Sequence, residues 1–224
     1  GNQASVRFGR QVVSWGESTF IQGGINAINP VDVSKLRVAG AELKQAFLPV
    51  NMLWGSYNFT DDFSAEAFYL LDFQKTDPDP VGAFFSTNDF AVIGGSYVML
   101  NFGTVPQPVI NPDLYEEVCV DGNFAASDSG LPATLVAAGC SAAFPRSKTR
   151  AAGDSGQGGI ALRYFAESLN NTEFGFYAMN YHSRVPLISG IAVTNTAPSS
   201  GSFFTEYPED IHLFGVSFNT SLEA

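Results

Sequence analysis

Six stretches of the chain alternate between apolar and polar residues with a period of two. This period is typical of β-strands that have one apolar face and one more polar face. It is sharpest in residues 63–74. Every second residue from Phe63 to Phe73 is apolar or aromatic, and Glu66 and Asp72 lie on the other face. The pattern predicts strands at residues 5–13, 50–60, 63–74, 159–166, 172–184 and 211–221.

The connections between these strands alternate in length. Short turns follow the second and fourth strands, whereas residues 14–49, 75–157 and 185–210 are long. Short turns at one rim and long loops at the other are typical of outer-membrane β-barrels, and a soluble sandwich has no reason to sort its loops in this way. The expected fold is therefore all-β, an antiparallel transmembrane β-barrel section of about six strands with long external loops.

The number of strands limits what this chain can form alone. The smallest membrane barrels have about eight strands, and an open edge in hydrocarbon leaves backbone groups unpaired at several kcal/mol each. We therefore expect residues 1–224 to form a single domain that is an incomplete part of a larger barrel.

Composition fits a sheet that has little contact with water. Charged residues make up 15% of the chain, below the quarter typical of soluble domains. The net charge of −11, with 11 basic residues, excludes nucleic acid as a partner because binding phosphates requires Lys and Arg. No stretch resembles the apolar helix of about 20 residues that spans a membrane. We expect localisation in the bacterial outer membrane, with its lipids as partners.

A series of short motifs runs from the first predicted strand to the second. They are Gly9-Arg10-Gln11, Ser14-Trp15-Gly16-Glu17-Ser18, Gly24-Ile25-Asn26, Asn29-Pro30-Val31-Asp32, Ala41-Glu42-Leu43-Lys44 and Pro49-Val50-Asn51. In this order they resemble the proteobacterial family catalogued as domain of unknown function 1302. The resemblance is good over about the first hundred residues and weaker in the last strand.

The resemblance implies a large outer-membrane barrel without a settled biochemical activity. It also implies genes that lie near envelope transporters of the resistance-nodulation-division type, which are possible partners. The expected function is passage or export of hydrophobic or amphiphilic compounds or lipids across the outer membrane, with no enzymatic activity and no cofactor. The alternatives are an outer-membrane hydrolase with an active site at the rim, and a soluble all-β surface or adhesin domain.

The loop after the first strand supplies candidate functional residues. One interpretation is a loop folded into the lumen, where Trp15, Glu17, Asn29 and Asp32 gate it or contact a solute. The other is a structural plug held by Arg10 and Glu17 as a buried, paired charge set. Both interpretations use the same residues, so the sequence does not separate them.

Alternation also predicts which strand residues face the lumen, although a register error of one residue would invert each strand. The predicted lumen-facing residues are Arg7, Trp54, Ser56, Glu66, Asp72 and Arg163.

The two cysteines, Cys119 and Cys140, lie in a stretch of small and polar residues. In an exported protein they are expected either to form one disulfide or to remain two unrelated buried thiols.

The motif Gly153-Asp154-Ser155-Gly156 resembles the sequence around a protease nucleophile. Such catalysis needs a histidine base with an acidic partner, and the two histidines, His182 and His212, lie in predicted strands among apolar neighbours. A structural interpretation of the motif is therefore favoured, and no metal site is predicted.

Overall fold

The computed structural model describes residues 2–16, 24–40, 42–86, 88–100 and 114–221, and the chain in them is mostly β. The chain folds into two compact units. Unit 1 comprises Gly1–Asp77, Ala151–Pro186 and Tyr207–Ala224, and unit 2 comprises Pro78–Arg150 and Leu187–Glu206. The single domain expected over residues 1–224 stays a prediction.

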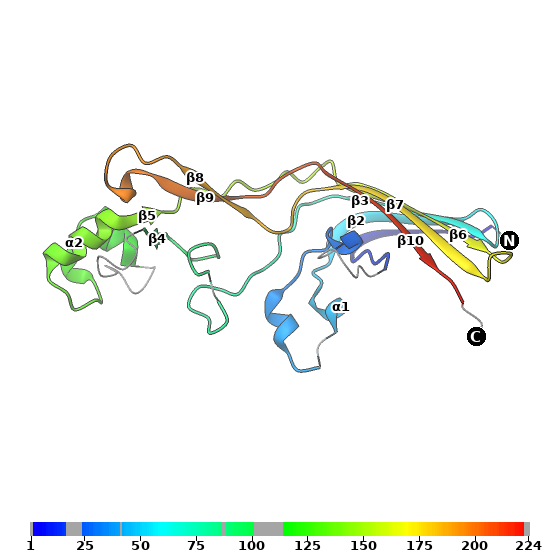
Figure 1. Cartoon of the computed structure of the whole chain (residues 1–224), viewed down its shortest axis with the longest axis horizontal. Coiled ribbons are helices and arrows are strands. Elements are labelled where there is room, and N and C mark those ends of the chain that lie inside the picture. The colour runs from blue at the N-terminus through cyan, green and yellow to red at the C-terminus, as the bar shows by residue number, and fades with distance from the viewer. Residues whose placement is uncertain (1, 17–23, 41, 87, 101–113, 222–224) are drawn as a thin grey trace. The chain divides into compact units, whose positions relative to one another are not determined.

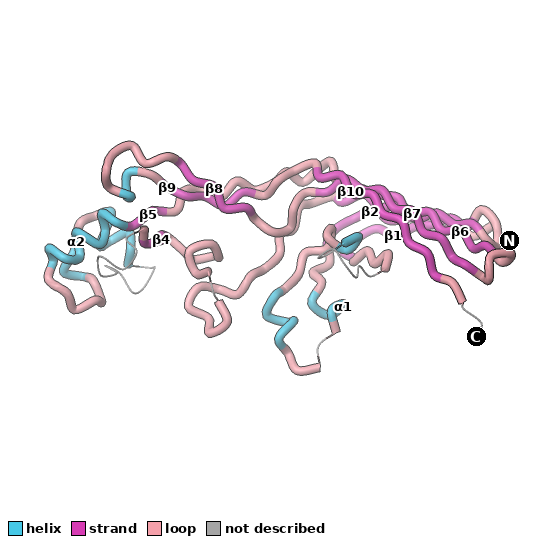
Figure 2. Tube along the Cα trace, viewed as in Figure 1, coloured by secondary structure: helices cyan, strands magenta, loops and turns pink. Residues whose placement is uncertain are grey.

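Unit 1 contains a six-stranded antiparallel sheet (Figures 1 and 2). Its strands pair in the order β1-β2-β3-β6-β7-β10, which is also their order in the chain. They are β1 (Ala4–Gln11), β2 (Val50–Asn58), β3 (Phe63–Leu70), β6 (Gly158–Ala166), β7 (Thr172–Tyr181) and β10 (Ile211–Asn219). The six strands predicted from alternation and their antiparallel arrangement are confirmed. Within the described residues β1 and β10 are the two edges, so this sheet is not closed into a barrel.

Five of the six strands end earlier than the alternation predicts, and the difference is largest for β3 and β7. β3 ends at Leu70, and shortly after it the carboxylate of Asp72 accepts hydrogen bonds from the backbone N (3.2 Å) and Nδ2 (2.8 Å) of Asn51. β7 ends at Tyr181, and the next side chain, His182, accepts a hydrogen bond from a backbone N–H just before β10. Side-chain bonds thus add to the few backbone bonds that continue beyond these two strand ends.

The connections sort by length as predicted. Residues 59–62 and 167–171 make the short turns, and residues 12–49, 71–157 and 182–210 make the long connections. Because neighbouring strands are antiparallel, the three long connections leave from one end of the sheet and the two short turns from the other.

The two faces of the sheet differ in what covers them. On the face that we call the outer face, large apolar side chains are exposed on all six strands; Val6 is 74% exposed and Phe214 78%. The strand register joins these two residues through one continuous row, Val6, Gly55, Ala67, Ile160, Ala178 and Phe214. Along this row the outer face is apolar from one edge of the sheet to the other.

The opposite face, the inner face, is covered by the connection between β1 and β2, which we call the β1–β2 loop (residues 12–49). Side chains of this loop and of the inner face form the core of unit 1: Val13, Trp15, Ile28, Val50, Met52, Phe68, Leu70, Ala161, Tyr177 and Met179. Burial of each large apolar side chain contributes about 1.5–3 kcal/mol. The loop contains the 3₁₀ helices η1 (Gly24–Asn26) and η2 (Val33–Arg37) and the short helix α1 (Leu43–Ala46).

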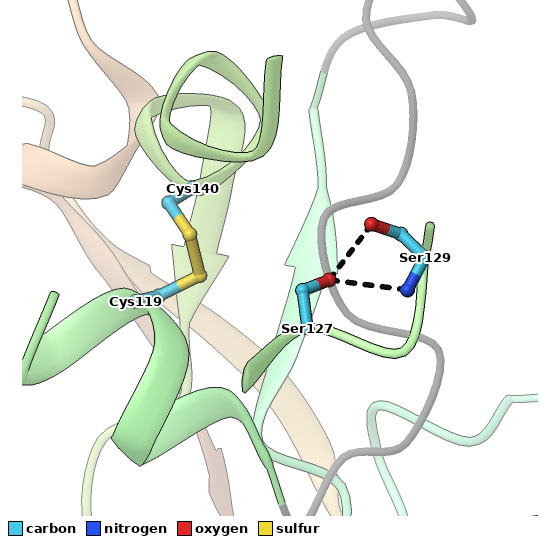
Figure 3. The surroundings of a disulfide bond; sticks show 4 residues. All are labelled: Cys119, Ser127, Ser129 and Cys140. Carbon is cyan, nitrogen blue, oxygen red and sulfur yellow. Dashed lines mark hydrogen bonds between the residues drawn. A yellow bond between two sulfur atoms is a disulfide. The ribbon is translucent and has the colours of Figure 1, made fainter. Parts of the chain in front are cut away.

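Unit 2 has its own core around a disulfide between Cys119 and Cys140, whose Cα atoms are 5.3 Å apart (Figure 3). The bond joins the π-helix η4 (Glu116–Val120) to helix α2 (Ala133–Ala142). Beside it the rings of Tyr97 and Tyr115 stack with centroids 4.7 Å apart. The remaining elements are β4 (Tyr97–Met99), β5 (Ala143–Pro145), β8 (Leu187–Ile191), β9 (Ser202–Glu206), η5 (Phe124–Ala126) and η6 (Pro198–Ser200).

Helix α2 and the two small sheets of unit 2, β4-β5 and β8-β9, were not predicted. In the part of the chain that the structure describes, no helix is long and apolar enough to cross a membrane.

Candidate functional site

The centre of the inner face is occupied by the side chain of Trp15. It is 3% exposed, and its indole Nε1 donates a hydrogen bond to Oε2 of Glu66 at 2.9 Å. Its ring lies against those of Phe68 (centroids 5.1 Å apart) and Tyr177 (6.0 Å). The β1–β2 loop is thus fixed to β3 by a charge-assisted hydrogen bond and to β7 by aromatic packing.

Glu66 is bound from two sides. Its Oε1 accepts a hydrogen bond from Nη1 of Arg163, which makes a half-buried ion pair. Nε of Arg163 also lies 4.0 Å from Oε1 of Glu173. Because both oxygens of Glu66 have partners, this carboxylate can lie beneath the loop without an unpaired charge.

Local sequence explains why Trp15 reaches this position. Just before it, Nδ2 of the buried Asn29 donates to the Val13 carbonyl at 2.6 Å, and Oδ1 accepts from Val13 N at 3.4 Å. Further along the loop, Ile25 lies over β10. A Cβ atom at Gly215 would be 3.3 Å from the Cγ2 atom of Ile25, so this glycine leaves room for the loop.

A second buried group holds the loop at the end of the sheet with the long connections. Arg184 is 3% exposed and donates through Nε to the Ile28 carbonyl (2.8 Å) and through Nη1 to the Gln74 carbonyl (3.1 Å). Its guanidinium carbon lies 5.3 Å from the ring centroid of Phe73. Burial lowers the pKa of Arg184 to about 10, against the opposing charge of Asp72. The side chain therefore stays charged at neutral pH.

His182 is buried beside this group, and backbone partners use both of its ring nitrogens. Nδ1 accepts from Asp210 N at 3.1 Å, so Nε2 is the protonated nitrogen and donates to the Ser155 carbonyl at 2.9 Å. The contact with Ser155 is to its carbonyl and not to its hydroxyl. In the Gly-Asp-Ser-Gly motif, Asp154 accepts from Phe73 N at 2.9 Å. The hydrogen bonds of His182 and Asp154 therefore join segments of the backbone, as the structural interpretation of the motif expects.

The other predicted residues lie in several places. Ser56 pairs with Glu66 in the register, and the guanidinium carbon of Arg7 lies 4.9 Å from the ring centroid of Trp54. These residues and Arg163 share the inner face, as the alternation indicated. Asp72 is bound to Asn51 near the ends of β2 and β3.

Arg10 and Asp32 do not join the group around Trp15. Nε and Nη2 of Arg10 donate to the Pro49 carbonyl, and Asp32 caps helix η2 by accepting from Ser34 N. A further hydrogen bond, donated by the Ser34 hydroxyl to the same carboxylate, lowers the pKa of Asp32. Glu17 lies outside the described residues.

The inner face therefore holds aromatic rings and one paired charge at its centre, where the β1–β2 loop buries the rings. Among the described residues no group of three or more His, Cys, Asp or Glu side chains could hold a metal ion. Sequence reasoning missed Arg184 and Tyr177. Tyr177 belongs to the alternating pattern of β7, but nothing in that pattern indicates its contact with a residue 162 positions earlier in the chain.

The model of one protein family, described as "Protein of unknown function (DUF1302)", matches the whole chain, residues 1–224. No curated protein and no solved structure was found to match. The matched range includes the six-stranded sheet and the loop that covers its inner face.

Proposed function

The chain belongs to the DUF1302 family, as its motifs between Gly9 and Asn51 predicted, and on this premise we propose that it is a section of an outer-membrane β-barrel that passes or exports hydrophobic or amphiphilic compounds or lipids. The edges of β1 and β10 then pair with strands outside residues 1–224. Hydrocarbon allows no unpaired sheet edge.

The exposed apolar side chains of the outer face are the observation that carries the proposal. Phe8 is 79% exposed, Val216 72% and Phe218 72%, whereas Met52, Phe68 and Leu70 on the inner face of β2 and β3 are buried. A soluble protein rarely leaves so large a contiguous apolar surface uncovered. The lipid-facing surface of a membrane barrel has this character.

The inner face supports passage of an amphiphilic solute. Phe68 and Tyr177 are buried against Trp15 of the β1–β2 loop, beside the Glu66–Arg163 ion pair, so a solute that displaces this loop would meet both apolar contact and hydrogen bonding. The β1–β2 loop lies on this face and would restrict the lumen. Envelope transporters are possible partners that receive or deliver the solute.

The first test uses the full-length protein expressed with its native signal peptide. Membranes are fractionated, and the outer-membrane fraction is run on a denaturing gel with and without boiling. Closed barrels resist unfolding by detergent, so we expect outer-membrane location and a change of mobility on heating. Uptake of a fluorescent amphiphile into cells that express the protein then tests passage.

Two results would contradict the proposal. Protein that is soluble in the periplasm without detergent and has no heat-dependent mobility would favour the soluble surface domain. A barrel that leaves amphiphile uptake at the level of an empty vector would retain the fold and reject the passage function.

A further inference from the structure

The outer face contains a groove over β1, β2 and β3. Its volume is about 300 Å³, and Val6, Leu53 and Tyr69 are among the residues that line it. Gly55 and Ala67, which pair between β2 and β3, also line it. The groove exists because two small residues lie side by side between the larger side chains of Val6, Leu53 and Tyr69.

Gly55 is not required by the sheet itself. A Cβ atom there would meet the Ser5 carbonyl oxygen at 3.6 Å, which is an ordinary contact distance. The position therefore accepts a side chain without strain in the backbone, and its glycine keeps the groove open. Every side chain lining the groove is apolar or aromatic, so its occupant is expected to be a hydrocarbon.

A cation lies on the same strand as the groove. Arg10 shares the alternating positions of β1 with Val6, and in the register it lies opposite Asn51. At roughly 3.4 Å per residue, the four steps along the strand from Val6 to Arg10 span about 14 Å. Arg10 is exposed, and its Nε and Nη2 donate to the Pro49 carbonyl at 3.3 and 3.1 Å. Asn51, opposite Arg10, donates a hydrogen bond to the carboxylate of Asp72, so that nearby carboxylate has a partner of its own.

We propose that the groove binds one acyl chain of an anionic lipid and that Arg10 binds the phosphate of its headgroup. The inference rests on the proposed function, which places the outer face against lipid. Two observations select this ligand. The groove is continuous with the apolar outer face, and the guanidinium lies at the end of the sheet with the long connections, where a barrel strand leaves the hydrocarbon.

The test is native mass spectrometry of the full-length protein, delipidated in detergent. It is titrated in parallel with dioleoyl phosphatidylglycerol, which is anionic, and dioleoyl phosphatidylethanolamine, which is zwitterionic and has the same acyl chains. We expect one phosphatidylglycerol molecule to bind more tightly than phosphatidylethanolamine. Gly55→Leu fills the groove and should lower the affinity for both lipids at least ten-fold.

Arg10→Gln should remove the preference for phosphatidylglycerol and weaken its binding about 5-fold, the effect of one interfacial cation. Val216→Leu is the matched control, because it enlarges an outer-face residue on β10 outside the groove, and it should bind as the wild type does. Ala67→Leu fills the groove from β3 and replaces Gly55→Leu if that variant loses its heat-dependent mobility.

Wild-type binding in the groove-filling variants would overturn the inference, and so would equal affinity for the two lipids. Binding that depends on Gly55 and Arg10 in a protein without heat-dependent mobility would support the lipid site and reject the barrel. A heat-modifiable barrel whose lipid binding ignores both residues would reject the lipid site alone.

Discussion

The indole Nε1 of Trp15 donates a hydrogen bond of 2.9 Å to Oε2 of Glu66, a residue 51 positions further along the chain. The other carboxylate oxygen of Glu66 is bound by Arg163 on β6. One carboxylate therefore connects the β1–β2 loop to two neighbouring strands. The loop is fixed at the centre of the inner face and not merely at its ends.

Trp15→Phe removes this hydrogen bond and keeps most of the aromatic contact. A hydrogen bond to a charged group contributes about 1.5–3 kcal/mol, so the loop should open more often and be cleaved by protease about ten-fold faster. Limited proteolysis within residues 12–49 measures this effect. Trp54→Phe, on the same face and under Arg7, is the control. Equal cleavage of Trp15→Phe and wild type would show that the bond does not hold the loop.

Arg184→Met should destabilise the fold more than Arg184→Lys. Methionine leaves the carbonyls of Ile28 and Gln74 without their buried donor, which costs about 2–4 kcal/mol. Lysine keeps the charge but lacks the planar fork that reaches two acceptors at once, so an intermediate loss is expected. The midpoint temperature of the mobility change on heating measures both variants. A methionine variant with the wild-type midpoint would refute this role.

The strands could be predicted from the sequence because a face that meets an apolar environment imposes a period of two on every strand. Glu66 and Arg163 were placed on the inner face by that period alone. The contacts of Trp15 could not be predicted in this way. They depend on how a loop returns over the sheet, and alternation within a strand carries no information about that path.

Unit 2 was not predicted for a different reason. Helix α2 consists largely of small apolar residues, so it lacks a polar stripe with a period of 3.6. Its place is set by the bond between Cys119 and Cys140 and by packing around Val136. Arg184 was missed because it is the last residue of the strand predicted at 172–184, a position where the side chain of a basic residue usually meets water.

Lysine substitutions at two adjacent positions of β1 distinguish a membrane barrel from a soluble sheet. Val6 belongs to the outer face, and Ser5 belongs to the inner face in the register. Val6→Lys should lower the stability of a membrane barrel by up to about 2–4 kcal/mol, whereas Ser5→Lys should have little effect. Refolding into lipid vesicles, followed by the mobility change on heating, measures the folded fraction. Similar folded fractions for the two variants would contradict a lipid-facing outer face.

The disulfide between Cys119 and Cys140 should be detectable by mass. Alkylation of the unreduced protein is expected to leave the mass unchanged, and alkylation after reduction should add two alkyl groups. The cysteines are 21 positions apart, so closing this loop contributes about 3 kcal/mol in the chain-entropy model. Cys119→Ser combined with Cys140→Ser should increase proteolysis within unit 2 while the strands of unit 1 stay protected. Alkylation of the unreduced, denatured protein would mean that the thiols are free.

All the long connections leave from one end of the six-stranded sheet, and both segments of unit 2 are parts of these connections. The short turns at residues 59–62 and 167–171 set the pairing of β2 with β3 and of β6 with β7 from the opposite end. Chain added to a long connection therefore need not shift the strand register. This separation gives the fold evolutionary freedom: related proteins can exchange or enlarge the segments between the strands while the sheet itself is inherited unchanged.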